Sequence, residues 1–314
     1  MKTHSYKIPI ICLIALIISL PQPVKASPAE YEPIMIVELF RHGARSTMYN
    51  IFNETSITKQ GLGELTPTGM RQHYNLGILV KNQYPTLFRG NNPTPFDYKV
   101  QTSYFNRTMQ SAYSHLLGIY DIGSGPELIT VLPEFIEPPY KKINEGQISL
   151  NQSLKNYALD QKVYPSKIFS IDWNNDNLFM SKTSIVCPYA ALMGNMTSAS
   201  HQKEMNDLVY PTGQQLLLSG FDPIQLYGKQ SFENQEISQF YDYARSYLFT
   251  YGKLPEKISD FLYKQLELIY SIWFYETFDY PGMRRVFANG FYKTVKEEFS
   301  KKISDPDYEM KYVG

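Results

Sequence analysis

The fold is decided by the stretch Ile34-Met35-Ile36-Val37-Glu38-Leu39-Phe40-Arg41-His42-Gly43-Ala44-Arg45. Its first seven residues form an apolar run interrupted by one glutamate, and such a run predicts a buried strand. The last five residues, Arg41 to Arg45, therefore begin at the carboxyl end of a strand, where open α/β sheets bind their ligands. We expect a functional loop here, and the alternative is a surface loop that happens to carry two arginines.

The side chains of this loop suggest a specific chemistry. The guanidinium groups of Arg41 and Arg45 match the geometry of phosphate oxygens, and the neutral imidazole of His42 can attack phosphorus. Gly43 has no Cβ, so the backbone can approach a ligand closely at this point. The loop is predicted to bind a phosphoryl group and to react with it through His42.

Residues 1–26 read as a secretory signal peptide that does not enter the fold. Lys2, His4 and Lys7 form a basic start, an apolar stretch follows, and Ala26 ends a segment suited to cleavage. The apolar part is too short for a comfortable membrane span, so we expect no stable membrane insertion. The sequence predicts the secretory pathway, with an extracellular or lysosomal destination.

The charge balance excludes one class of partner. Removal of residues 1–26 takes away three lysines and no acids, which leaves 27 basic and 30 acidic side chains. Nucleic acids and anionic membranes require a basic face, so neither is expected as a partner. The expected partner is a small molecule, and a homodimer is left open.

Cysteine and asparagine residues bear on the same compartment. Cys187 is the one cysteine after residue 26, and it is either buried and inert, which we favour, or paired with sequence outside this chain. Four sequons agree with glycosylation in the secretory pathway. They place candidate glycans on Asn53, Asn106, Asn151 and Asn195.

The residues after the loop predict alternating helices and strands. Thr66 is a suitable N-cap and Pro67 a suitable first helical residue, and apolar residues recur at helical spacing until residue 84. A short strand over 97–102 leads into a helix over 106–120. Strand, helix, strand, helix in this order predicts a parallel sheet with right-handed crossovers.

A composition change after residue 123 suggests an insertion. Prolines become frequent, and helical patterns appear near 200–219 and 234–251. We interpret 126–252 as a helical cap inserted into an α/β core formed by 27–125 and 253–314.

The last part of the expected core contains three further elements. Helices are predicted over Glu256–Thr277 and Phe287–Phe299, and Tyr308–Gly314 has strand character. The predicted fold class is a three-layer α/β/α core with a mostly parallel sheet and a mainly helical cap.

Three blocks of the sequence resemble the histidine acid phosphatases, the second branch of the histidine phosphatase superfamily. They are Phe40–Ser46, Gly63–Gly77 and Asn106–Ala112, in the order and spacing of that family. The resemblance is specific over 31–120 and only compatible from 121 to 314.

The resemblance implies a reaction and its residues. His42 would become a phosphohistidine that water then hydrolyses, while Arg41 and Arg45 would bind the phosphoryl oxygens. It implies no metal and no cofactor, and the sequence contains no cluster of metal ligands. Asp172 begins a segment that briefly imitates a calcium loop, but Asn177 and Thr183 stand where that loop needs Gly and Glu.

Two departures from the family pattern weaken the expected activity. Gln101 stands where the family places a third phosphate-binding arginine, six residues before Arg107. Loss of one charged contact costs roughly 1.5–3 kcal/mol, or about one to two orders of magnitude in rate. We keep Gln101 as a candidate substrate-binding residue. Arg107 is expected to anchor a helix start and the wall of the site, with phosphate contact as the second option.

The second departure concerns the proton donor. The family uses an Asp in a His-Asp pair after a late strand, and this chain ends where that pair would begin. Departure of an unprotonated alkoxide forfeits about 10²–10⁴-fold in rate. Two interpretations follow: the sequence is truncated, with an incomplete core, or it is a shortened relative without normal catalysis.

Other polar residues are weaker candidates. His73 is expected to pack or hydrogen-bond within a helix, and we expect no convergent partners for His115 and His201. Ser46 and Ser111 lack the context of a nucleophilic serine.

Two functions are therefore expected from the sequence. The first is an acid phosphatase that hydrolyses phosphomonoesters through His42, and the second is a catalytically impaired, secreted glycoprotein that binds a phosphorylated ligand.

Overall fold

The computed structural model describes residues 32–52, 59–88, 94, 96–120, 122–128, 156–176, 178, 188–279, 283–305 and 307–314. The predicted signal peptide and Cys187 lie outside these residues. The chain from Met35 to Gly314 forms one compact unit.

A parallel sheet stands at the centre of the α/β core. Within the described residues its strands are β1 (Ile36–Val37), β2 (Tyr98–Thr102), β3 (Ile168–Ser170) and β4 (Tyr312–Val313). They lie in the order β1-β4-β2-β3, and every pairing is parallel. The predicted parallel sheet is confirmed.

Strand β1 is shorter than the predicted run of seven residues. Its partner β4 has two residues, so the ladder is limited to the pairs Ile36↔Tyr312 and Val37↔Val313. Met35 is buried, but Leu39 is 62% exposed. The hydrophobic run therefore gives the strand's place but overstates its length and burial.

Strand β3 lies inside the range that the sequence assigns to the cap. It pairs with β2 through Val100↔Ile168 and so belongs to the core sheet. Three residues are too few to display a period of two, which is why the pattern gives no strand there. The domain limits stay a prediction.

The α-helices of the described residues are α2 (Pro67–Gln83), α3 (Pro85–Phe88), α4 (Asn106–Ile119), α6 (Pro188–Leu218), α7 (Pro223–Tyr227), α8 (Asn234–Tyr251), α9 (Asp260–Asp279) and α10 (Met283–Ser304). Helix α2 begins as predicted, because the Thr66 hydroxyl accepts the Gly69 N–H at 3.2 Å and Pro67 is the first helical residue. Helix α9 begins four residues later than predicted, and α10 is longer than predicted at both ends.

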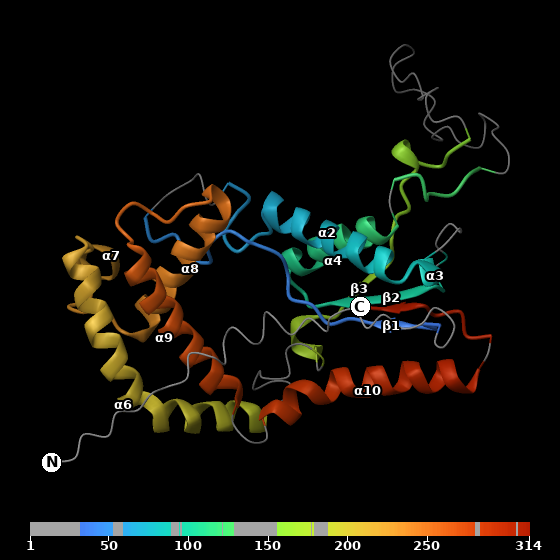
Figure 1. Cartoon of the computed structure of the whole chain (residues 1–314). Coiled ribbons are helices and arrows are strands. Elements are labelled where there is room, and N and C mark those ends of the chain that lie inside the picture. The colour runs from blue at the N-terminus through green and yellow to red at the C-terminus, as the bar shows by residue number, and fades with distance from the viewer. Residues whose placement is uncertain are drawn as a thin grey trace, which may run out of the picture. The chain divides into compact units, whose positions relative to one another are not determined.

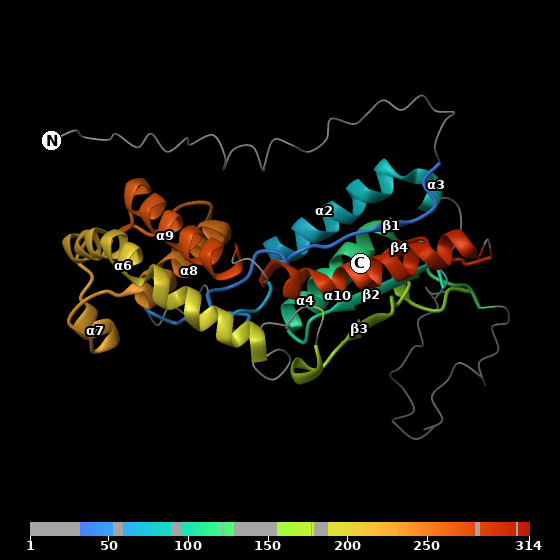
Figure 2. The ribbon, with the colours of Figure 1, turned by 90° about the horizontal axis from the view of Figure 1, so that it is seen from below.

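Helices cover both faces of the sheet (Figure 1). Helices α2 and α4 lie on one face, and they approach closely because a Cβ on Gly77 would overlap the His115 carbonyl, while a Cβ on Gly118 would overlap that of Tyr74. Helix α10 runs along the other face (Figure 2). Its Glu298 is 1% exposed and accepts a hydrogen bond from Lys99 of β2 at 3.0 Å. The expected three-layer α/β/α arrangement is confirmed.

A second hydrophobic cluster holds the helical part, α6 to α9, together. It includes Leu216 of α6, Ile237 and Phe240 of α8, and Leu266 and Ile269 of α9, each at most 2% exposed. Helix α9 thus packs with helices that precede residue 252, although the sequence-based division places it in the core. No helix in the described part of the chain combines the length and apolar character needed to cross a bilayer.

Candidate active site

The loop Arg41–Arg45 leaves the carboxyl end of β1 and turns against α2 and α4. The backbone N–H and the hydroxyl of Thr66 both donate to the Ala44 carbonyl, at 2.9 and 2.8 Å. The Gly43 N–H donates to the Ser111 hydroxyl of α4 at 3.0 Å. A Cβ on Gly43 would overlap the first turn of α2. The loop is therefore held rigidly, and its glycine is required by this close approach.

The ring of His42 is oriented by the backbone. Its Nδ1 lies 2.8 Å from the Gly43 carbonyl oxygen. A carbonyl oxygen only accepts, so Nδ1 carries the hydrogen and Nε2 keeps a free lone pair. Burial, together with the nearby Arg41, Arg107 and Arg45, lowers the pKa of His42 from 6.5 to about 4. The imidazole is consequently neutral in mild acid, which is the form that acts as a nucleophile.

Arg41 and Arg45 differ in their partners. Burial lowers the pKa of Arg41, and repulsion from Arg45 and Arg245 adds to this effect. Arg45 instead forms a two-point ion pair with Asp242 of α8, with Nη2–Oδ1 at 2.5 Å and Nη1–Oδ2 at 3.2 Å. This pair joins the loop to the helical part of the protein.

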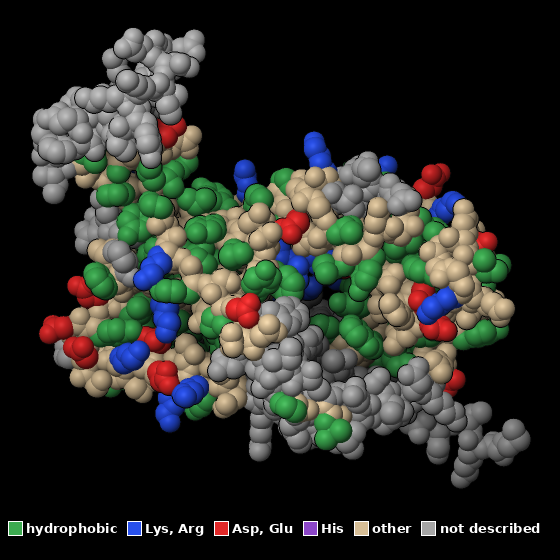
Figure 3. Space-filling model, turned by 180° about the vertical axis from the view of Figure 1, so that it is seen from behind, with side chains coloured by type: hydrophobic (Ala, Val, Ile, Leu, Met, Phe, Trp, Pro, Cys, Tyr) green, Lys and Arg blue, Asp and Glu red, His purple; other side chains and the backbone are tan. Residues whose placement is uncertain are grey.

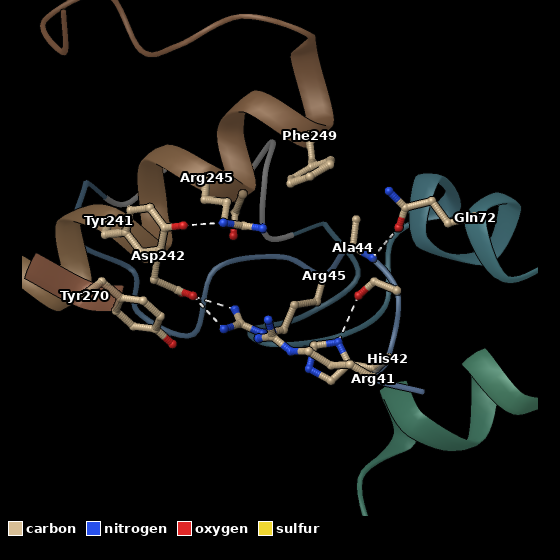
Figure 4. Close-up of a pocket in the computed structure, with 12 residues that line it drawn as sticks. Arg41, His42, Ala44, Arg45, Gln72, Tyr241, Asp242, Arg245, Phe249 and Tyr270 are labelled. Carbon is tan, nitrogen blue, oxygen red and sulfur yellow. Dashed lines mark hydrogen bonds and ion pairs between the residues drawn. The ribbon is translucent and has the colours of Figure 1, made fainter. Parts of the chain in front are cut away.

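A cavity of about 280 Å³ opens beside His42. Arg41 to Arg45 form one wall, α8 forms the opposite wall, and Gln72 of α2 and Tyr270 of α9 complete the lining. Figure 3 shows the molecule from behind, with a hollow in the surface that contains Lys or Arg side chains. In Figure 4 the α8 side chains face the loop across the space.

The sequence does not single out the residues that α8 contributes to this wall. Arg245 lies four residues after Tyr241 and three after Asp242, and Phe249 follows Arg245 by four, so all four side chains share one face of the helix. The sequence suggests a substrate entrance for the Tyr-rich segment 240–251 only as a second option to cap core. The helix provides both, since Phe240 and Tyr243 are buried in the cluster and Tyr241 lines the cavity.

Gln101 is not among the residues that line this cavity. It lies on β2, where its backbone N–H donates to the Gly314 carbonyl at 2.8 Å. Its side chain lines a separate small space with Lys99 and residues of α10. This placement does not support contact between Gln101 and a ligand held at His42.

Arg107 lies in the first turn of α4, as expected. Its guanidinium stands 4.0 Å from the ring centroid of Phe105, and its Nη1 donates to the Gly63 carbonyl at 3.4 Å. It does not line the cavity, but its charge contributes to the lowered pKa of His42. Its place at the start of α4 is as expected, whereas a role in the wall of the cavity stays a prediction.

Two buried histidines contact the chain at the start of the loop and just before it. The Nε2 of His73 lies 3.0 Å from the Arg41 carbonyl oxygen, which agrees with the expected packing role. The prediction for His115 was wrong, because its Nε2 lies 3.0 Å from Glu38 Oε2 and its ring stacks on Phe40. The Tyr312 hydroxyl donates to the same carboxylate at 2.8 Å. These partners come from distant parts of the chain, so no local pattern indicates them.

The candidate glycosylation sites are only partly described. Asn106 is exposed at the start of α4. Asn53 and Asn151 lie outside the described residues, as do the side chains of Asn195 and His201. Within the described part, no three His, Cys, Asp or Glu side chains gather as metal ligands would.

Comparisons with known proteins agree on one family. The model of the histidine phosphatase superfamily, branch 2, matches residues 22–245. Lysosomal acid phosphatase of Xenopus laevis is 29% identical over 119 residues, which cover 37% of this chain and 27% of that protein. Prostatic acid phosphatase of Bos taurus is 28% identical over 122 residues, which cover 38% and 30%. The matches therefore span less than a third of these relatives.

Two further similarities extend this result. Putative acid phosphatase 5 of Caenorhabditis elegans is 33% identical over 100 residues, which cover 31% of this chain and 23% of that protein. The crystal structure of Klebsiella sp. ASR1 phytase superposes with a TM-score of 0.56 at 14% identity, over 90% of this chain and 69% of the phytase. That superposition shows a shared fold.

Proposed function

This chain belongs to branch 2 of the histidine phosphatase superfamily, and on that premise we propose that it hydrolyses phosphomonoesters at acid pH through His42. One observation carries the proposal. The free Nε2 of His42 and the guanidinium groups of Arg41 and Arg45 stand around a single cavity. A neutral nucleophile between two fixed cations is suited to accepting a phosphoryl group.

The first step is phosphoryl transfer to the protein. Nε2 attacks phosphorus, the bond to the ester oxygen breaks, and the electron pair leaves with that oxygen. The hydrogen bond from Nδ1 to Gly43 holds the ring and stabilises the positive charge that it gains. Arg41 and Arg45 offset the negative charge on the phosphoryl oxygens.

The second step restores the enzyme. A water molecule attacks phosphorus, the phosphorus–nitrogen bond breaks, and its electron pair returns to Nε2. Overall, one proton of the water ends on the departed alkoxide, and the remaining hydroxyl leaves as part of orthophosphate. The lowered pKa of His42, about 4, supports this chemistry near pH 5 because the imidazole stays unprotonated there.

The wall opposite His42 faces the leaving group. It combines the aromatic rings of Tyr241, Phe249 and Tyr270 with the guanidinium of Arg245. At about 280 Å³ the cavity is at the small end of ligand pockets. These features favour a small ester with an aromatic or anionic leaving group.

A second candidate function rests on the carboxylate in the cavity. Among the described residues that line it, Asp242 is the one with a carboxyl group. Asp242 is already engaged by the protein, because it pairs with Arg45 and accepts the Met48 N–H. A secreted glycoprotein that binds a phosphorylated ligand and turns it over poorly is therefore the alternative.

The test uses protein expressed from this sequence in a secreting host. Turnover of p-nitrophenyl phosphate is measured between pH 4 and 6 for the wild type, for His42→Ala and for Lys293→Ala, a control on the exposed side of α10. p-Nitrophenolate leaves without a proton, so this substrate does not require a general acid. We expect His42→Ala to lose at least about a thousandfold in kcat/KM and Lys293→Ala to be unchanged.

Trapping of the intermediate completes the test. Alkaline quenching of a reaction with phosphorus-labelled substrate should leave label on His42 in the wild type and none in His42→Ala. Equal activity of wild type and His42→Ala would remove His42 from the mechanism. Phosphate binding without any turnover would favour the second candidate.

A further inference from the structure

Arg45 uses only part of its hydrogen-bonding capacity on the protein. A guanidinium has five N–H donors. One Nη1 hydrogen goes to the Ser46 carbonyl at 2.9 Å, and one hydrogen each from Nη1 and Nη2 goes to Asp242. The described residues offer no partner to the Nε–H and the outer Nη2–H. These two donors lie on one edge of the guanidinium and form a fork that matches two phosphoryl oxygens.

Asp242 is itself firmly held. Its Oδ2 accepts the Met48 backbone N–H at 2.7 Å and lies 3.1 Å from the Thr47 hydroxyl. Its side chain is 13% exposed, and that of Arg45 is 14% exposed. The carboxylate is thus fixed by the residues that follow Arg45, and it in turn fixes the plane of the guanidinium.

The negative charge of Asp242 also favours the grouping of the arginines around the cavity. Burial and the repulsion from Arg45 lower the pKa of Arg41 and of Arg107, and the charge of Asp242 offsets part of this lowering. A carboxylate among clustered guanidiniums reduces the cost of holding them together before an anion arrives.

We infer that Asp242 is a positioning residue for phosphoryl binding: it holds the guanidinium of Arg45 by one edge and leaves the other edge free for two oxygens of the phosphoryl group. The inference rests on the proposed function, since it concerns the same site. It also makes α8 necessary for the chemistry, because a residue 197 positions away from Arg45 sets the geometry of that arginine.

The test measures the affinity for inorganic phosphate by titration calorimetry, which requires no turnover. Asp242→Asn keeps the shape of the side chain and removes its charge, and we expect phosphate to bind about tenfold to a hundredfold more weakly. In an Arg45→Gln background, Asp242→Asn should change phosphate affinity by less than twofold, because the guanidinium that Asp242 holds is absent. kcat/KM for p-nitrophenyl phosphate should follow the same pattern.

A matched control separates positioning from general support. Asp97→Asn removes the charge of another buried carboxylate, which pairs with Lys311 at 2.9 Å and does not line the cavity, so it should lower the melting temperature but leave phosphate affinity within twofold. If Asp242→Asn does not fold, Asp242→Glu replaces it; this variant keeps the charge but displaces it by one methylene, and it should also weaken phosphate binding.

The outcomes distinguish this inference from the proposed function. Tighter phosphate binding by Asp242→Asn would show that Asp242 competes with the ligand, and would overturn the inference. An undiminished effect of Asp242→Asn in the Arg45→Gln background, or an equal effect of Asp97→Asn, would reduce Asp242 to a structural role. Asp242→Asn could weaken phosphate binding only where Arg45 is present, while the wild type binds phosphate but turns over no substrate. That result would support the inference and contradict the proposed phosphatase activity. A wild type that binds no phosphate would overturn both.

Discussion

The imidazole of His42 should titrate near pH 4 in the folded protein, because burial and the cations Arg41, Arg107 and Arg45 lower its pKa from 6.5 to about 4. At pH 5 about nine-tenths of the rings would then be neutral, compared with about 3% for an imidazole of ordinary pKa. The structure therefore predicts about thirtyfold more neutral imidazole at pH 5 than an exposed histidine would provide.

Nuclear magnetic resonance of the histidine ring protons measures this midpoint directly. The resonance of His42 is the one that disappears in His42→Asn. Replacement of the neighbouring cation in Arg41→Gln should move the midpoint upward by about one pH unit or less. A wild-type midpoint near 6.5, or no change in Arg41→Gln, would refute the account of the site as a buried ring among cations.

The same shift has a consequence for stability. Because the pKa is lower in the folded than in the unfolded protein, the contribution of His42 to stability is present above pH 6.5 and is lost as the pH falls toward 4. The free energy of unfolding, measured with urea, should fall less between pH 6.5 and 4 in His42→Asn than in the wild type.

Three further substitutions test other parts of the structure. Gly77→Ala should lower the free energy of unfolding by about 1–3 kcal/mol because the new Cβ overlaps α4, whereas Gly213→Ala, whose Cβ would meet nothing closer than 3.3 Å, should have a smaller effect in the same denaturant titration. Burial opposes ionisation of Glu298, but hydrogen bonds from Tyr308 and Lys99 outweigh it and lower its pKa below 4.5. Glu298→Gln should thus destabilise the protein at pH 7, and the difference from wild type should shrink as the pH falls below 4.5. Arg245→Gln should reduce kcat/KM more for a carboxylated aryl phosphate than for phenyl phosphate, and equal losses on both substrates would argue against a charge contact with the leaving group.

Much of the core was predictable because its signals are local. The N-cap at Thr66, the proline after it and the helical spacing together gave α2 almost to the residue. The regular periods of β2, α4 and α8 were equally clear. Strand β3 was missed because three residues carry no period, and the length of β1 was overestimated because a ladder depends on its partner strand.

For the site as well, groupings of residues close in sequence were predictable, and contacts between distant residues were not. The grouping of Arg41, His42 and Arg45 was predicted, because they are neighbours in sequence and follow one strand. Asp242 was not predicted, since an acidic residue on a helix with no visible partner reads as a solvated surface residue. The sequence also left Gln101 as a candidate ligand contact, and only the register of β2 beside β4 directs it to another space.

The sequence alone determined the loop Arg41–Arg45 and most of the strands and helices, because hydrophobic period, capping residues and a five-residue motif act within a few positions of one another. The tertiary structure decided what surrounds that loop. Long-range contacts bring α8 and α9 to the cavity, pair Arg45 with Asp242 and place His115 against Glu38. Such pairs depend on packing and charge between segments that are far apart in sequence, so no single segment indicates them.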